Sequence, residues 1–141
     1  MPNHCCNTLY VITGSLSLIV ETYIRKDEAS QGIFDFEKIV PVGDAADWYE
    51  QRLEKWGTKW VGYGVCIGES SIEFCTAWTP PIPIVKKLAE LHKGFAFRLE
   101  YYETGMAFRG FATAEWIDGE AQLVDSCWDM ASKDFEELDL I

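Results

Sequence analysis

The chain has 141 residues, of which 48% are apolar and 14% are aromatic, so it is long and apolar enough to bury a core without disulfide bonds. Its 23 acidic residues outnumber 12 basic residues and give a net charge of −11, which disfavours binding to DNA, RNA or an anionic membrane and favours a basic partner. No apolar run approaches the roughly 20 residues of a membrane span, and the opening run Met1–His4 lacks the pattern of a secretory signal, so we expect a cytoplasmic protein.

Hydrophobic periodicity and turn residues divide the chain into strands and helices. Period-two alternation predicts a strand, apolar residues three and four positions apart predict a helix, and Gly, Pro, Ser or Asp predict the boundaries. In chain order these patterns predict a strand over Cys5–Thr13, a helix from Ser15 or Ser17 to about Arg25, a strand over Ile33–Ile39, a helix from Asp44 to Gly57, strands over Val61–Gly68 and Ile72–Trp78, a helix from Thr79 to Gly94, strands over Phe95–Tyr101, Met106–Trp116 and Ala121–Trp128, and an acidic tail or short helix over residues 129–141.

Three of these elements carry more specific expectations. The strand over Ile33–Ile39 is expected to be half exposed, because Phe alternates there with acidic residues. In the second helix, the residues of the apolar stripe are Tyr49, Leu53 and Trp56. In the third helix, the residues of the buried stripe are Ile84, Leu88 and Leu91.

The two strands on either side of Ser70-Ser71 predict a hairpin with unlike faces. A turn at these serines places Tyr63 opposite Trp78 and Ile67 opposite Phe74, and these bulky side chains are expected to meet the helices. The other face carries small residues, namely Gly62, Gly64, Cys66, Gly68, Cys75 and Ala77. Because these side chains are small, another segment can pack closely on this face. We expect either the insert Ser30–Val42 or a second copy of the protein in a homodimer to cover it.

The order of the elements predicts the fold class. Hairpins dominate, and Asp118-Gly119 between the last two strands is a strong type I′ turn signal. We therefore expect an α+β fold, an elaborated ferredoxin-like sandwich with a mainly antiparallel sheet and helices packed on one face. No Pro-, Gly- or Ser-rich linker divides the chain, so residues 1–141 are expected to form one domain.

Several short runs occur together in a distinctive combination: Met1-Pro2-Asn3 with Cys5 or Cys6 and Asn7, then Trp56-Gly57-Thr58-Lys59-Trp60, Thr76-Ala77-Trp78 with Pro80-Pro81, and Glu100-Tyr101 with Gly105 and Phe108. This combination, spread over roughly residues 1–110, resembles the YubB-type ferredoxin-like family, also called Api-like phage proteins, of phages, prophages and conjugative plasmids. The run from Trp56 to Trp60 is the most specific element, whereas His4 stands where Trp is more usual. The resemblance implies the fold and a mobile-element origin in a bacterial host cell, and it implies no reaction.

The cysteines do not predict a metal or disulfide site. Five cysteines, at positions 5, 6, 66, 75 and 127, are an odd number, and free thiols are expected in the cytoplasm. Cys5 and Cys6 are adjacent on a strand and point to opposite faces, so they do not easily share one ion. Cys66 and Cys75 are predicted to be cross-strand neighbours that stay reduced. We expect no metal and no cofactor.

The sequence assembles no catalytic group. A Cys–His pair would have to use His4 or His92, and no orienting third group accompanies either of them in the sequence. The run from Trp56 to Trp60 could stack a base, but Lys55 and Lys59 are a thin supply of positive charge. Trp56 is therefore expected to pack at a helix end. We expect the protein not to be an enzyme.

The acidic end is the feature with the sharpest functional interpretation. From Glu115 to Ile141 the chain holds nine acids and one Lys. Carboxylates along a surface can imitate DNA phosphates and occupy a basic channel, with aromatic side chains as anchors. The plainer alternative is a solvated acidic face that keeps the protein soluble. The candidate partner-binding residues are Asp118, Glu120, Asp125, Asp129, Asp134, Glu136, Glu137, Asp139, Trp116 and Trp128.

Three functions remain open at this point. The first is a phage- or plasmid-encoded inhibitor that binds a basic host defence protein, such as a CRISPR effector or a restriction enzyme, by DNA mimicry and without chemistry. The second is a nucleotide- or RNA-binding module that uses the sheet, which needs aromatic side chains on the exposed sheet face. The third is an enzyme that acts on a small molecule above the bare face of the hairpin.

Overall fold

The structure is a computed structural model that describes residues 4–44, 46–103, 105 and 107–129, except for the side chains of residues 128 and 129. The elements in chain order are β1 (His4–Thr13), α1 (Leu16–Tyr23), β2 (Ile24–Lys26), β3 (Gly32–Phe34), the 3₁₀ helix η1 (Phe36–Lys38), α2 (Trp48–Lys55), β4 (Gly62–Ile67), β5 (Ser71–Ala77), α3 (Ile82–Leu91), β6 (Ala96–Glu103), β7 (Phe108–Ile117) and β8 (Glu120–Asp129). In this part of the chain no helix combines the length and the apolar character needed to cross a membrane.

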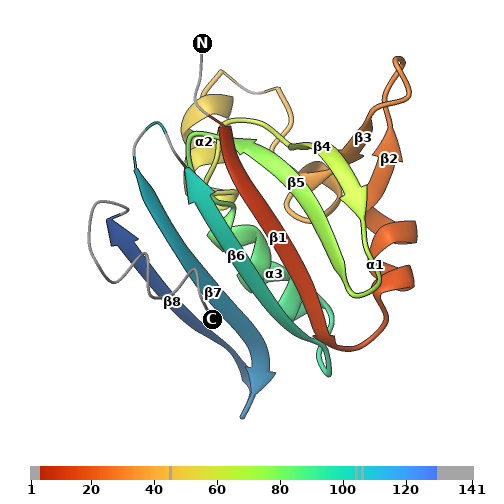
Figure 1. The fold of residues 1–141 in the computed structure, drawn as a ribbon, viewed down its shortest axis with the longest axis vertical. Helices are drawn as coiled ribbons and strands as arrows, with labels where there is room; N and C mark the ends of the chain where they lie inside the picture. The colour runs from red at the N-terminus through yellow and green to blue at the C-terminus, as the bar shows by residue number, and fades with distance from the viewer. Residues whose placement is uncertain (1–3, 45, 104, 106, 130–141) are drawn as a thin grey trace.

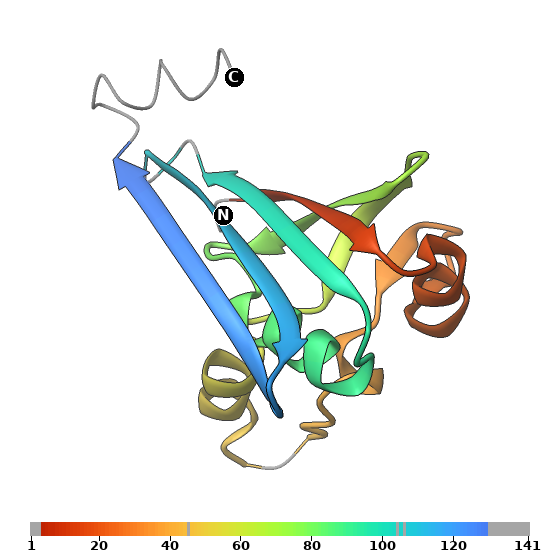
Figure 2. The ribbon, with the colours of Figure 1, turned by 90° about the horizontal axis from the view of Figure 1, so that it is seen from below.

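The strands form one sheet in the order β2-β3-β4-β5-β1-β6-β7-β8, and each neighbouring pair is antiparallel. Helices α2 and α3 lie behind the sheet in Figure 1, and the view from below in Figure 2 places them on the same side. The other face, called the open face below, carries no helix among the described residues. The expected fold class is confirmed: an α+β ferredoxin-like sandwich with an antiparallel sheet and helices on one face.

The core lies between the sheet and the helices. The period-two alternation in β1 and β6 is confirmed, because every second side chain is buried from Cys5 to Val11 and from Phe97 to Glu103. In α3 the buried residues are Ile84, Val85, Leu88 and Ala89. The prediction for Leu91 is wrong, since this side chain is 49% exposed. At 100° per residue, Leu91 falls outside the buried arc that the other four residues span.

The predicted strand over Ile33–Ile39 is wrong beyond Phe34. The Asp35 carboxylate accepts a hydrogen bond from the Glu37 amide and starts the 3₁₀ helix there. Phe36 remains buried, so the alternation marked burial and not a continuous strand. Asp is a preferred cap residue. A short strand followed by a capped turn therefore gives the same alternation of Phe with acidic residues as one longer strand would. The short strand β2, which pairs with β3 directly after α1, was not predicted.

The predicted stripe of α2 is wrong for Tyr49 and Leu53 and right for Trp56, which is fully buried. The helix begins at Trp48 with Asp47 as its N-cap residue, later than expected from Asp44. Tyr49 and Leu53 are 43% and 42% exposed. Instead, the Arg52 guanidinium lies 4.7 Å and 4.8 Å from the ring centroids of Trp48 and Trp56. Trp48, Arg52 and Trp56 are four residues apart, so they form the stripe of this helix that faces the protein.

The register predicted for the β4–β5 hairpin is wrong. Tyr63 lies opposite Cys75, and Ile67 lies opposite Ile72, with an irregularity between Tyr63 and Cys66. Gly64 has a φ of 63° within this irregularity, which is typical of a β-bulge. An extra residue in a strand reverses the faces of those that follow it. Tyr63 therefore shares the open face with Cys75, and this face is not bare.

The insert Ser30–Val42 does not cover the open face. Its strand β3 pairs with β4 and extends the sheet, and both Phe34 and Phe36 pack on the core residue Phe74. Cover by a second copy of the protein stays a prediction.

Candidate functional site

The β7–β8 hairpin forms one end of the sheet. Its turn residues Asp118 and Gly119 have φ values of 53° and 84°, which confirms the predicted type I′ turn. The ladder runs from the pair Phe108–Asp129 to the pair Ile117–Glu120. Strand β8 is outermost, with β7 as its neighbour in the sheet. Residues 110–129 contain five acids and no Lys or Arg.

Three exposed carboxylates lie close to the turn, and we call them the hairpin carboxylates: Glu115, Asp118 and Glu120. Glu115 lies opposite Gln122, whose side-chain amide donates to Glu120 Oε1 at 2.9 Å. Because the neighbouring Ala114 is buried on the helix side, Glu115 and its cross-strand partner point to the open face. Glu115 therefore lies on the open face, Asp118 lies at the tip, and Glu120 lines a hollow on the helix side.

Asp125 is directed to the other side. It lies opposite the buried Ala112, and its carboxylate accepts a hydrogen bond of 2.8 Å from the hydroxyl of Tyr101. Burial, followed by this contact with Asp125, raises the pKa of Tyr101. The structure thus ties Asp125 to the core strand β6 and does not group it with the hairpin carboxylates.

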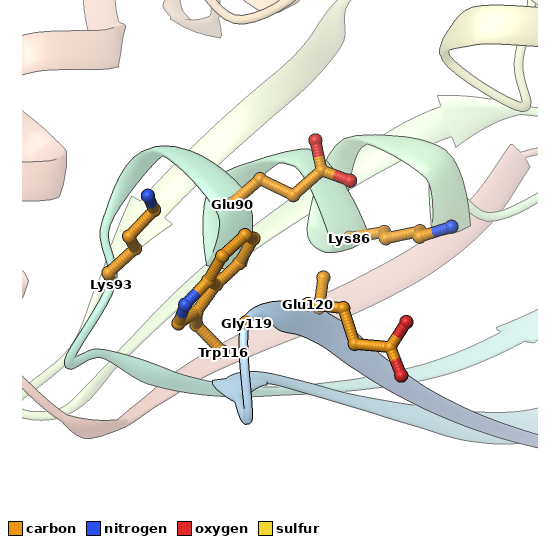
Figure 3. A pocket seen from close by; sticks show the side chains of 7 residues that line it. Lys86, Glu90, Lys93, Trp116, Gly119 and Glu120 are labelled. Atoms are coloured by element: carbon orange, nitrogen blue, oxygen red, sulfur yellow. The ribbon is translucent and has the colours of Figure 1, made fainter.

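Trp116 lines a surface hollow of about 410 Å³ between the hairpin and α3. Figure 3 shows Lys86 from α3, and Lys93 just beyond the end of this helix, near Trp116 and Glu120. The Lys93 ammonium lies 4.4 Å from the Trp116 ring centroid, a cation–π contact. On the helix side, therefore, lysines moderate the negative charge of the hairpin, and its excess charge is displayed toward the tip and the open face.

The remaining predicted residues are placed only in part. Trp128 and Asp129 belong to β8, opposite Arg109 and Phe108, and their side chains lie outside the description. The other predicted acids, which are Asp134, Glu136, Glu137 and Asp139, lie outside the described residues.

Sequence reasoning missed an apolar groove on the open face beside the hairpin carboxylates. The groove has a volume of about 350 Å³, and its exposed aliphatic residues come from three strands. These are Ile12, Ile117 and Val124, with 63%, 42% and 57% exposure. The signal was present, because Ile117 and Val124 alternate with inward-facing residues, but finding it requires the cross-strand register.

Three of the resemblance motifs, at Asn7, at Trp56–Trp60 and at Thr76–Trp78, meet in a set of buried polar contacts that we call the motif junction. The Asn7 amide donates to Thr76 Oγ1 at 2.9 Å, and this hydroxyl donates to the Thr79 carbonyl at 2.7 Å. The Thr58 hydroxyl donates to the Ala77 carbonyl at 2.8 Å. Trp56 is fully buried, and its indole donates to the Val40 carbonyl at 2.8 Å. The expectation that Trp56 packs at a helix end is confirmed.

A family model described as the ferredoxin-like domain in Api92-like protein matches residues 55–140. The chain belongs to this family. The match spans β4 to β8, so both the hairpin carboxylates and much of the motif junction lie within the family's domain. No curated protein and no solved structure matches the chain.

In this Api92-like ferredoxin-like protein two of the thiols, those of Cys5 and Cys75, are unsuited to nucleophilic chemistry. Burial raises the pKa of Cys5 to about 12 and that of Cys75 to about 11, so both are protonated at neutral pH. Cys5 and Cys6 point to opposite faces, as expected. The predicted pairing of Cys66 with Cys75 is wrong, because Cys75 lies opposite Cys6 and Tyr63.

The two imidazoles are each engaged by a tyrosine. His4 Nδ1 forms a hydrogen bond with the hydroxyl of Tyr63, and His92 Nε2 lies 2.6 Å from the hydroxyl of Tyr23. Burial lowers the pKa of His92. Among the residues that the structure describes, no group of three or more His, Cys, Asp or Glu side chains is arranged to hold a metal ion.

Proposed function

We propose that this Api92-like protein acts by binding a basic protein through its β7–β8 hairpin, without catalysing a reaction. One observation carries the proposal: the hairpin at the end of the sheet displays exposed carboxylates, and residues 110–129 contain no base. Clustered carboxylates favour encounter with a positively charged surface and exclude polyanions from the same place.

The partner that fits this charge best is a nucleic-acid-binding protein, because such proteins carry basic grooves for phosphate. The resemblance to YubB-type phage and plasmid proteins supports a more specific proposal. On this proposal the chain is a mobile-element inhibitor of a host defence protein, such as a CRISPR effector or a restriction enzyme. It occupies the basic groove of that protein and thereby blocks DNA from it.

The experiment is a plasmid-transformation assay in bacterial hosts that carry a defined CRISPR or restriction system directed against the plasmid. We expect expression of the wild-type chain to raise transformation at least about tenfold with one of these systems. The test variant combines Glu115→Gln, Asp118→Asn and Glu120→Gln. Asn suits the left-handed turn position, so the hairpin is retained.

The matched control neutralises three exposed acids away from the hairpin, with Glu21→Gln, Glu50→Gln and Glu54→Gln. It removes the same charge from the molecule. We expect the control variant to protect the plasmid like the wild type and the hairpin variant to lose protection. Equal protection by both variants, or no protection with any of the systems, contradicts the proposal.

A specific observation favours a second candidate, a module that binds single-stranded nucleic acid. Contrary to the sequence-based expectation, the open face carries aromatic side chains, namely Tyr10, Tyr63, Tyr102 and Phe111. Aromatic side chains on a sheet can stack bases. However, Arg98 on this face is paired with Glu100 at 3.1 Å and stacked 4.3 Å above Phe111. Binding of a labelled oligonucleotide tighter than about micromolar at physiological salt would favour this candidate over the first.

A further inference from the structure

The apolar groove and the hairpin carboxylates form one continuous surface. Thr13, Ala96, Glu115 and Gln122 lie in one row across β1, β6, β7 and β8, as the register shows. All four residues line the groove. The carboxylate of Glu115 therefore lies in the same row of side chains as residues that line the groove.

The shape of the groove follows from its residue sizes and from a local irregularity in β1. The small side chains of Ala96 and Thr113 keep the floor low, while Ile12 and Val124 are the most exposed aliphatic side chains around it. The register of β1 against β6 shifts between Val11 and Thr13, at the position of Ile12. Such irregularities re-aim a side chain. The result is an exposed apolar hollow on a sheet, a feature that marks interaction sites.

The charges around the groove are negative. Glu115 lines it, and Asp118 directly follows Ile117 at the tip. Glu120 accepts a hydrogen bond from Gln122, which lines the groove, while Glu120 itself lines the hollow on the helix side. The nearest arginine along this face of β6, Arg98, is engaged with Glu100. Lys86 of α3, and Lys93 just beyond its end, lie at the other hollow, on the helix side of the hairpin.

We propose that the groove takes one large apolar side chain of a cationic protein segment, whose flanking Lys or Arg residues pair with the hairpin carboxylates. This inference rests on the proposed function and names the chemistry of the partner segment. A buried apolar anchor with a surrounding ring of polar contacts is the usual arrangement of an interface with high affinity. A second copy of the chain would bring the same carboxylates against this rim, and an anionic lipid surface would be repelled by it.

The probe is a synthetic nonapeptide with Leu-Phe-Leu at its centre and three Lys residues on each side. Two comparison peptides replace the centre by Ser-Ser-Ser or the lysines by Glu. Backbone amide NMR shifts of the ¹⁵N-labelled full chain locate the binding site, and their titration gives the dissociation constant. We expect the Lys peptide with the apolar centre to shift residues around Ile12, Thr113 and Val124, and to bind at least about tenfold more tightly than either comparison peptide.

Two variants separate the apolar anchor from the charged rim. Ile12→Thr with Val124→Thr keeps the β-branched shape and removes apolar surface, whereas Glu115→Gln with Glu120→Gln removes charge. The control, Leu18→Gln with Leu91→Gln, changes residues of comparable exposure, 42% and 49%, on α1 and α3. We expect both test variants to weaken binding about tenfold, while the control binds like the wild type and all spectra remain dispersed.

If only the charge variant weakens binding, the apolar anchor is refuted while the proposed function survives. If only the apolar variant does so, or if the Glu peptide binds equally well, the cationic chemistry of the partner segment is refuted. Shifts that cluster elsewhere, or no binding of the Lys peptide, also overturn the inference. The transformation assay tests the proposed function independently of all these outcomes.

Discussion

Two regions of the molecule contain a tryptophan beside a cation, and they use it in opposite ways. At the motif junction, Trp56 is fully buried, stacks with Arg52 and donates its indole hydrogen bond to the Val40 carbonyl. At the hairpin, Trp116 is half-buried at a surface hollow, with Lys93 above its ring and exposed carboxylates nearby. The most recognisable sequence motif of the chain therefore maintains the fold, whereas the surface best suited to a partner has no comparable motif.

The difference has a physical basis. Positions at the junction are restricted by packing: a Cβ atom on Gly57, which has a φ of 79°, would lie 2.6 Å from Pro83 Cδ. At the hairpin, Glu115 and Asp118 are exposed, and the proposed binding would depend only on their charge and location. We therefore expect substitutions at the junction to change stability and substitutions at the hairpin to change binding.

The largest expected effect is that of Trp56→Ala. Removing a fully buried indole leaves a cavity and an unpaired Val40 carbonyl, so we expect the free energy of unfolding to fall by about 3–5 kcal/mol. Urea denaturation followed by circular dichroism measures this change. Trp60→Ala is the control, because Trp60 is 37% exposed and Lys59 lies above its ring, and it should cost less than about 1.5 kcal/mol. Equal losses for the two variants would remove the distinction between junction and surface.

A smaller effect is expected for Thr58→Val, which keeps the shape of the side chain. The substitution removes the buried hydroxyl that donates to the Ala77 carbonyl, and it should lower the free energy of unfolding by about 1–3 kcal/mol. Thr22→Val serves as the control, because Thr22 makes a similar hydrogen bond to the Leu18 carbonyl on an exposed helix face. A Thr58 variant as stable as the wild type would show that the polar contacts of the junction are dispensable.

The combined hairpin substitutions Glu115→Gln, Asp118→Asn and Glu120→Gln should leave the free energy of unfolding within about 0.5 kcal/mol of the wild type. The three side chains are exposed, and their removal also relieves repulsion in a chain with a net charge of −11. The same urea titration tests this expectation. A loss comparable with that of Thr58→Val would mean that the hairpin carboxylates stabilise the fold instead of being held for a partner.

Two native cysteines allow the buried junction and the exposed hairpin to be compared without any substitution. Cys5, at the junction, is fully buried, and its pKa is raised to about 12 mainly by burial, whereas Cys127 on β8 is exposed. Thiolate is the reactive form, so at neutral pH a thiol reagent should modify Cys127 within the native protein and Cys5 only on unfolding. Peptide mapping after short labelling distinguishes them. Raising the pH toward 9 should still leave Cys5 unmodified, because its pKa of about 12 lies well above that pH.

The sequence predicted the elements whose pattern is enforced by burial on one face, and it failed where local geometry changes that pattern. The alternation over Phe97, Leu99 and Tyr101 and the turn at Asp118-Gly119 were predicted correctly. The β4–β5 register was wrong because Gly64 also fits a regular strand, and only the folded chain reveals the bulge.

The candidate surface could be predicted only in its charge. The excess of acids near the end of the chain is visible in the sequence, but the direction of each side chain is not. Asp125 is turned toward Tyr101, and the groove at Ile12 and Val124 unites residues more than a hundred positions apart. Such a surface depends on cross-strand register, which a single sequence determines weakly when a strand contains an irregularity.

The central claim is that a partner covers the hairpin carboxylates, and the most direct test is carboxyl labelling of the chain with and without its bound partner. A carbodiimide with an amine probe modifies accessible carboxylates, and mass spectrometry gives the extent at each residue. We expect the partner to protect Glu115, Asp118 and Glu120, while Glu21, Glu50 and Glu54 stay equally labelled. Protection of the second set, with the hairpin carboxylates still fully modified in the complex, would contradict the account.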